Sequence, residues 1–176
     1  MKKLLIVIDM QNDFITGSLG TPHARAIVRN VKAKIDEYNQ RGEPIVFTRD
    51  THNDNYGETQ EGRHLPVEHC IFGSEGWKIH VGLDDGCAGC LYVDKPAFGW
   101  PHWDETLREL ITDVDEIELC GLCTDICVVS NALILKAHFP ETKITVDAKC
   151  CAGVTEESHK AALETMKMCQ VNVVNE

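Results

Sequence analysis

The chain alternates between short apolar runs and longer segments in which apolar residues recur every three or four positions. A short, continuous apolar run is typical of a strand that is buried on both faces of a parallel sheet. Recurrence at every third or fourth position is typical of a helix with one buried face. We predict strands at residues 4–8, 45–48, 91–93, 117–120, 144–146 and 171–174.

Helical patterns fill most of the intervals between these strands. They cover residues 24–38, 103–111 and 125–138, and a last helix begins after Thr155, whose side chain we expect to act as the N-cap. Strands that alternate with helices predict one α/β domain over residues 1–176. We expect a doubly wound, Rossmann-like and mostly parallel six-stranded sheet with helices on both faces, because parallel crossovers are right-handed.

A long polar connection, at about residues 50–89, separates the second predicted strand from the third. Most connections in compact domains are much shorter, and long ones that are mounted on a rigid sheet are more often functional than idle. We therefore expect this connection to carry contacts to a ligand.

Charge and cysteine content narrow the possible partners and the compartment. The chain has 17 basic and 28 acidic residues, a net charge of −11, which argues against a nucleic-acid partner. Its apolar runs are too short for a membrane helix, so we expect a cytoplasmic protein with no membrane partner and mostly free thiols. The Cys87 and Cys90 pair lacks a second such pair for a zinc site and is expected to be two ordinary thiols in a loop. Acidic α/β enzymes of this size commonly self-associate, so we expect a homo-oligomer.

Candidate chemistry lies where the strands end, because ligands of such sheets bind at the carboxyl ends of the strands. Asp9 ends the first predicted strand, Asp50 the second and Lys95 follows the third. Cys127 falls in the first turn of the apolar helix if Thr124 or Asp125 is its cap.

A thiol at that position is a candidate nucleophile. The helix N-terminus and the ammonium of Lys95 would both favour the thiolate of Cys127. Asp9 could accept the thiol proton, and the backbone N–H groups of Cys123 and Cys127 could bind an oxyanion. These residue types predict a cysteine hydrolase.

Three blocks of the sequence carry a family resemblance. Residues 7–14 (VIDMQNDF), 94–99 (DKPAFG) and 121–128 (GLCTDICV) resemble the signature blocks of the isochorismatase-like cysteine hydrolases, and residues 147, 153–155 and 159–163 resemble the closing block. The resemblance implies the doubly wound fold and a catalytic triad of Asp9, Lys95 and Cys127. It also implies a cis peptide bond between Leu122 and Cys123 that directs the oxyanion-binding N–H groups.

The long connection contains metal-ligand residue types. Asp50 and His52 are two positions apart, so an extended strand end points them to the same side, and Glu61 and His69 follow. Glu58 and His64 are near enough in sequence to replace Glu61 as the third ligand. The set resembles that of the nicotinamidase branch of the family, which holds one divalent ion. Zinc is the ion we favour, with manganese or iron as alternatives.

These observations lead to a functional prediction with rivals. The resemblance implies a metal-assisted amidohydrolase that converts nicotinamide to nicotinate and ammonia through a thioester on Cys127, a reaction of NAD salvage. One alternative is a related hydrolase that acts on a carbamoyl, ureido or enol ether substrate, in which the metal-ligand residues would take no part in the reaction. The other is a redox role for Cys87 and Cys90.

The expected partner is a small-molecule amide, and we expect three aromatic residues to line its pocket. These are Phe14, which would stack on a flat ring, and Phe98 and Trp100. The sequence departs from the nicotinamidase pattern at residues 65–68 (LPVE), where a bulky aromatic residue usually precedes the His-Cys pair. That departure concerns the pocket wall and hence the substrate.

Overall fold

The protein is a single sheet covered by helices, in a computed structural model that describes residues 2–87, 89–110 and 114–176. The sheet has six strands in the order β3-β2-β1-β4-β5-β6, and each neighbouring pair is parallel. The strands are β1 (Lys3–Ile8), β2 (Ile45–Asp50), β3 (Leu91–Lys95), β4 (Glu116–Leu122), β5 (Lys143–Ala152) and β6 (Asn172–Val174). The predicted doubly wound sheet is therefore confirmed, and its strand pairs are all parallel.

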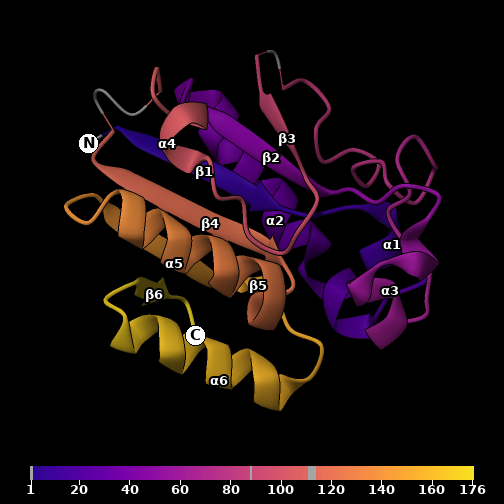
Figure 1. Cartoon of the computed structure of the whole chain (residues 1–176). Helices are drawn as coiled ribbons and strands as arrows, with labels where there is room; N and C mark the ends of the chain where they lie inside the picture. Colours follow the sequence, from indigo (N-terminus) through magenta and orange to yellow (C-terminus); the bar gives the residue numbers. More distant parts are fainter. Residues whose placement is uncertain (1, 88, 111–113) are drawn as a thin grey trace.

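Helices cover both faces of the sheet (Figure 1). Alternate side chains of β1 explain why: Leu4, Ile6 and Ile8 pack in one apolar cluster, and Leu5 and Val7 pack in another. The first cluster includes residues of α4 (Trp103–Thr106), α5 (Val129–His138) and α6 (Glu156–Met168), and the second includes residues of α2 (Pro22–Arg41). A strand buried between two such layers needs the continuous apolar run that the sequence shows.

The remaining helical elements are short. They are α1 (Asn12–Ile15), the 3-10 turn η1 (Tyr56–Glu58), α3 (Gln60–His64) and the π-helical turn η3 (Thr124–Val128). The predicted helix at 103–111 is shorter than expected, because α4 ends at Thr106 and Ile111 lies outside the described residues. The predicted helix at 125–138 is divided into η3 and α5. Thr155 caps α6 as predicted, since its side chain accepts the N–H of Ser158.

The order of the strands places a crevice at one end of the sheet. From β1 the chain adds β2 and β3 on one side, and β4, β5 and β6 on the other. Loops leave β1 and β4 in opposite directions, so a gap forms beyond their carboxyl ends. The segments after Ile8 and Leu122 border this gap.

The described part of the connection between β2 and β3 forms a lobe beside α1 (Figure 1). Isolated bridges pair His52 with Ile71 and Gln11 with Ile79, so this lobe is attached both to itself and to the segment after β1. Near its end Cys87 and Cys90 form a disulfide. The expectation of two ordinary thiols is wrong here, because the Cα atoms of the two residues lie 5.6 Å apart, within the range that a disulfide spans. No helix in the described part of the chain is both long and apolar enough to cross a bilayer.

Candidate active site

Asp9, Lys95 and Cys127 meet at the bottom of the crevice. The ammonium of Lys95 lies 2.6 Å from Asp9 Oδ2 and 3.5 Å from Cys127 Sγ, and it donates to the carbonyl oxygen of Ala97 at 3.2 Å. All three side chains are buried. The structure therefore brings together the three residues that the sequence proposed as a triad: Asp9 directly after β1, Lys95 at the end of β3 and Cys127 in the turn after β4.

The backbone at Asp9 turns sharply where β1 ends. Its φ of 46° lies in the left-handed region, which is uncommon for a residue with a Cβ. The N–H of Asp9 donates to Thr48 Oγ1 at 3.1 Å, and the Thr48 hydroxyl donates to Asp9 Oδ1 at 2.6 Å. Thr48 of strand β2 thus fixes the Asp9 carboxylate in place. A strained backbone conformation such as that of Asp9 persists only where the surrounding contacts hold it.

Burial is the largest influence on the acid–base state of the triad. It raises the pKa of Cys127 well above its usual value; Asp9 raises it further, and Lys95 only partly offsets this. Burial also raises the pKa of Asp9, against the effect of Lys95. Burial alone would lower the pKa of Lys95, but Asp9, Cys127 and Asp50 together raise it, so Lys95 stays charged. Burial and Asp9 therefore oppose the resting thiolate that the sequence predicted for Cys127, and Lys95 favours it.

The turn that carries Cys127 begins at a cis peptide bond between Leu122 and Cys123, the position that the resemblance implied. Its N-cap is Cys123, not Thr124 or Asp125, and no side chain caps it. The carbonyl oxygen of Cys123 instead accepts the N–H groups of Ile126 and Val128 at 3.1 and 3.0 Å. The second bond spans five residues and makes the π-helical turn, a form that is frequent at functional sites.

Asp50, His52, Glu61 and His69 form a second group, with one possible ligand atom from each lying within 4.8 Å of the others. Asp50 Oδ2 is 3.0 Å from His52 Nε2 and 3.4 Å from His69 Nε2, and Glu61 Oε1 is 3.7 and 3.8 Å from the same two nitrogens. Among the described residues the alternatives Glu58 and His64 are not in this cluster. The geometry therefore favours Glu61.

The donors of this cluster fit a divalent metal ion. Ligand atoms about 2.1 Å from zinc at tetrahedral angles lie roughly 3.4 Å from one another, close to the separations of the cluster. His69 Nδ1 bonds to the carbonyl oxygen of Val67 at 2.8 Å, which leaves Nε2 directed at the cluster, as is usual for metal-binding His. Two imidazoles with two carboxylates suit zinc, manganese or iron.

The pKa shifts of the carboxyl groups in the cluster also favour a bound cation. Burial by itself would raise the pKa of Asp50, but bonds to His52 and His69 and the nearby Lys95 lower it well below its usual value. Burial, then Asp50, raise the pKa of Glu61. Two close carboxylates repel one another, and a divalent cation would relieve that repulsion.

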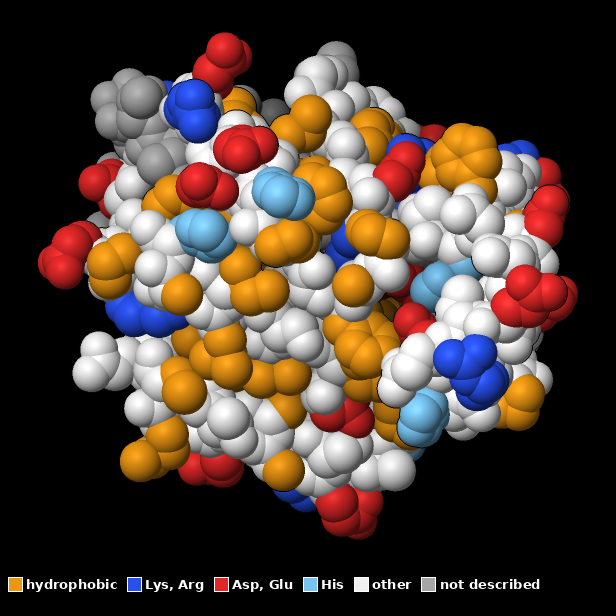
Figure 2. Space-filling view, in the orientation of Figure 1, with side chains coloured by type: hydrophobic (Ala, Val, Ile, Leu, Met, Phe, Trp, Pro, Cys, Tyr) orange, Lys and Arg blue, Asp and Glu red, His pale blue; other side chains and the backbone are white. Residues whose placement is uncertain are grey.

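A cavity of about 410 Å³ connects the two groups. Cys127 lines it together with Asp50, Glu61 and His69, and its walls are mainly apolar. Figure 2 shows the opening between the lobe with α3 and helix α5, where acidic and His side chains lie recessed beside hydrophobic ones. The wall residues are Phe14, Leu19, Thr21, Ala24, His64, Leu65, Phe98, Leu122, Cys123, Ile126, Gly153 and Val154.

Of the three predicted pocket residues, two line the cavity and one does not. Phe14 also packs on His69, with ring centroids 5.6 Å apart. Trp100 is not among the described lining residues: its indole N–H donates to Thr106 Oγ1 at 2.8 Å, and its ring packs against the core. The expectation for Trp100 is wrong because its backbone N–H donates to Asn131 Oδ1 of α5 at 2.9 Å and its indole N–H to Thr106 of α4, so these two helices hold it.

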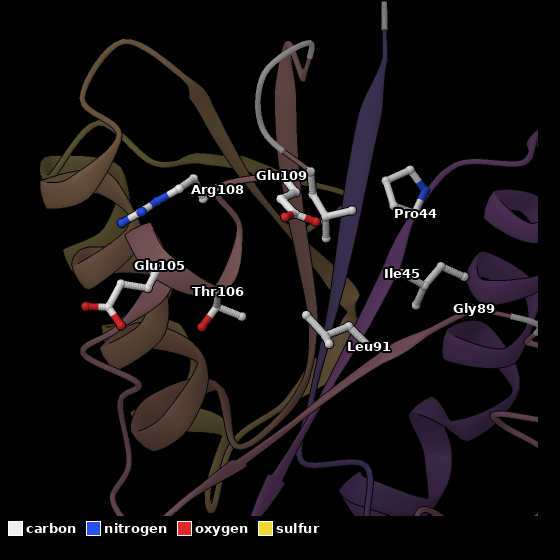
Figure 3. A pocket seen from close by; sticks show the side chains of 9 residues that line it. Pro44, Ile45, Gly89, Leu91, Glu105, Thr106, Arg108 and Glu109 are labelled. Atoms are coloured by element: carbon white, nitrogen blue, oxygen red, sulfur yellow. The ribbon is translucent and has the colours of Figure 1, made fainter.

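A larger cavity, of about 730 Å³, opens at the opposite end of the sheet (Figure 3). Pro44 and Ile45 border it where β2 begins, and Glu105 and Arg108 of the α4 region lie across from them. Its described lining residues include no Cys, His or Asp. Because ligands of this fold bind at the carboxyl ends of the strands, we assign the site by chemistry and not by size.

Sequence reasoning missed several residues around the site. Tyr56 is buried behind the metal-ligand cluster, with its ring centroid 4.7 Å from that of His52 and 5.0 Å from that of His69. Residues 65–68 lack the aromatic residue that is usual before the His-Cys pair, and Tyr56 provides an aromatic contact from an earlier part of the connection. Thr48, which bonds Asp9, lies within a strand and resembles any buried Thr in sequence. Neither carries a local signal, since both act through contacts between distant segments.

The fold and the two buried groups define a hydrolase of one family. Residues 3–175 match the isochorismatase domain family, and the chain therefore belongs to it. It is 29% identical to the nicotinamidase/pyrazinamidase of Mycobacterium tuberculosis over 189 residues, with 98% of each chain covered. The crystal structure of a nicotinamidase from Bacillus subtilis has a TM-score of 0.86 at 28% identity, covering 99% of this chain and 100% of that one.

A third comparison concerns the metal. The pyrazinamidase of Pyrococcus horikoshii, solved in complex with zinc, has a TM-score of 0.84 at 28% identity, and the whole of each chain is covered. The likeness supports a divalent metal site in this chain.

Proposed function

We propose that this protein is a metal-assisted cysteine amidohydrolase that converts nicotinamide to nicotinate and ammonia. The observation that carries the proposal is that one cavity is lined both by the Cys127 thiol and by carboxylate and imidazole groups of the metal-ligand cluster. A flat heteroaromatic amide has two reactive ends that match these two groups, namely its carboxamide carbon and its ring nitrogen.

The triad performs the bond changes. Cys127 gives its proton to Asp9 as its sulfur attacks the carboxamide carbon, and backbone N–H groups of Cys123 and Cys127 bind the oxyanion. Asp9 then gives that proton to the departing nitrogen, which leaves as ammonia. Water attacks the thioester, Asp9 accepts its proton, and nicotinate and the Cys127 thiol are released. Lys95 stays protonated throughout and stabilises whichever of the two partners is anionic.

The cluster positions the substrate. Asp50, His52, Glu61 and His69 would hold one divalent ion, with zinc favoured, and such an ion supplies a Lewis-acid site for the ring nitrogen. Phe14 would stack on the ring, because it lines the cavity beside His69.

The lining favours a neutral substrate over an acid. The described lining residues include no Lys or Arg, and Asp50 and Glu61 are acidic. Lys95 is already paired with Asp9. A carboxylate on the substrate would therefore find no cation of the chain to pair with, and burying an unpaired charge is costly. This disfavours carbamoyl amino acids and similar anions as alternatives.

The test is ammonia release by the purified, zinc-supplemented protein from three substrates. Nicotinamide should be turned over, and benzamide, which matches it except for the ring nitrogen, should have a lower kcat/KM by about 10²-fold or more. A carbamoyl amino acid should be inert. Equal rates with nicotinamide and benzamide would contradict the proposed role of the cluster in binding the ring nitrogen. Faster turnover of the carbamoyl amino acid than of nicotinamide would overturn the proposed substrate.

A further inference from the structure

Strand β1 ends two residues before the neighbouring strand β2 does. The register pairs Leu5 with Ile45, Ile6 with Val46 and Val7 with Phe47, and continuing it would place a β1 residue beside Asp50. The chain instead turns away at Asp9, where φ is 46°. The backbone N–H and C=O of Asp50 on that side would then lack partners, although Asp50 is buried.

The side chain of Gln11 replaces the missing strand. Its Oε1 accepts the N–H of Asp50 at 2.7 Å, and its Nε2 donates to the carbonyl oxygen of Asp50 at 2.9 Å. The second proton of Nε2 goes to the carbonyl oxygen of Trp77 at 2.8 Å. Gln11 is fully buried, so its amide acts as a peptide group of the sheet and fixes the backbone from which the Asp50 carboxylate projects.

Asp13 holds the backbone directly after a second metal-ligand residue, His69. Its Oδ2 accepts the N–H of Cys70 at 2.8 Å, directly after His69. A Cβ on Gly76 would lie 2.0 Å from that Oδ2, so the carboxylate fits closely against this turn. The N–H of His52 in turn donates to the carbonyl oxygen of Cys70 at 3.0 Å, which joins a third ligand residue to the same support.

We propose that Gln11 and Asp13 are positioning residues that set the spacing of Asp50 and His69, and so join the metal-ligand cluster to the segment that carries Asp9. The inference rests on the metal site of the proposed function. Partners of this kind around metal ligands change metal affinity when they are lost. Asn12, between the two, bonds Glu75 and His80 instead and touches none of the four ligand residues.

The experiment measures the zinc dissociation constant of the full-length protein by competition with a chromogenic chelator, alongside its melting temperature. Gln11→Met and Asp13→Ala should weaken zinc binding by about 10- to 100-fold while the protein remains folded. Asp13→Asn, which restores an acceptor oxygen, should return most of the affinity, and Asn12→Ala should bind zinc as the wild type does.

Zinc affinity within about twofold of wild type in both Gln11→Met and Asp13→Ala would overturn the inference, even if their melting temperatures fell. If Gln11→Met does not fold, the Asp13 pair of variants decides the matter. A wild-type protein that binds no zinc would overturn the inference and the metal site together. Weakened zinc binding in a protein that does not hydrolyse nicotinamide would support the inference and contradict only the proposed substrate.

Discussion

The triad and the metal-ligand cluster share one cavity, but the chain constructs them in different ways. Asp9, Lys95 and Cys127 lie at the ends of strands or in the turn that follows, so the register of the sheet sets their distances. Of the cluster, only Asp50 ends a strand, and the other three lie in the connection between β2 and β3. Changes to the triad should therefore affect chemistry and the buried charge balance, whereas changes to the cluster should affect metal binding and leave the core intact.

The largest effect is expected for the nucleophile. Cys127→Ala should lower kcat for nicotinamide by at least about 10³-fold, since an activated nucleophile has no substitute in the site. Ammonia release measures this, and circular dichroism should show an unchanged fold. Cys120→Ala is a matched control, because Cys120 is also a buried free thiol but does not line the cavity. Appreciable turnover by Cys127→Ala would contradict the triad.

Loss of the buried cation should reduce stability as well as activity. Lys95→Met leaves Asp9 and Asp50 without their shared ammonium, and an uncompensated buried charge costs about 3–5 kcal/mol of unfolding free energy. Urea denaturation measures the loss. Lys167→Met, which removes an exposed lysine with two acidic partners, should leave the midpoint where it is. Equal stability of the two variants would argue that Asp9 is protonated in the resting protein.

Loss of a metal-ligand side chain should reduce zinc binding and activity but leave the stability of the fold nearly unchanged. His69→Ala should abolish tight zinc binding and reduce kcat/KM by about 10²-fold or more, because loss of a group that only supports a metal ligand already costs about 10- to 100-fold. Its urea midpoint in the presence of chelator should stay close to that of the wild type treated in the same way. His64→Ala is the control from the same lobe, and similar zinc loss in both variants would reopen the choice of ligands.

The pocket wall should affect binding more than chemistry. Phe14→Leu keeps an apolar side chain but removes the stacking surface, so KM for nicotinamide should rise about 5- to 10-fold, an aromatic contact being worth about 0.5–1.5 kcal/mol. kcat should change little. Trp100→Phe, outside the cavity, should leave KM as it is; a larger rise there than in Phe14→Leu would contradict the placement of the pocket.

The smallest expected effect is a shift in pH dependence. Burial raises the pKa of Asp9, and the hydroxyl that Thr48 donates to it lowers the pKa, because the bond favours the carboxylate. Thr48→Val should raise the pKa further. The acid limb of kcat/KM, below which Asp9 is protonated and cannot accept the thiol proton, should move up by about one pH unit or less. Thr145→Val removes a comparable buried hydroxyl far from Asp9 and should not move it; a downward shift in Thr48→Val would contradict the assignment of Asp9 as the base.

The sequence predicted most of the fold and the residues of both groups, for a physical reason. Buried strands need continuous apolar runs, and the triad residues lie within or just after them, so position along the chain implies position in space. Where that link is lost, prediction failed. Trp100 follows a turn, and Cys87 and Cys90 meet in a loop. Glu61 was predicted as a ligand, but the sequence left Glu58 and His64 as alternatives because the choice depends on how α3 packs. The acid–base state of Cys127 depends on burial, which its neighbours in sequence do not reveal.

The central claim is that the thiol and the metal-ligand cluster act on one bound amide. The most direct test is the rate of ammonia release from nicotinamide by protein that has been stripped with a chelator, dialysed and then reloaded with one equivalent of zinc. Activity should be lost on stripping and return on reloading, while Cys127→Ala stays inactive in both states. Full activity of the stripped wild-type protein would contradict the claim, because the triad alone would then be sufficient for the reaction.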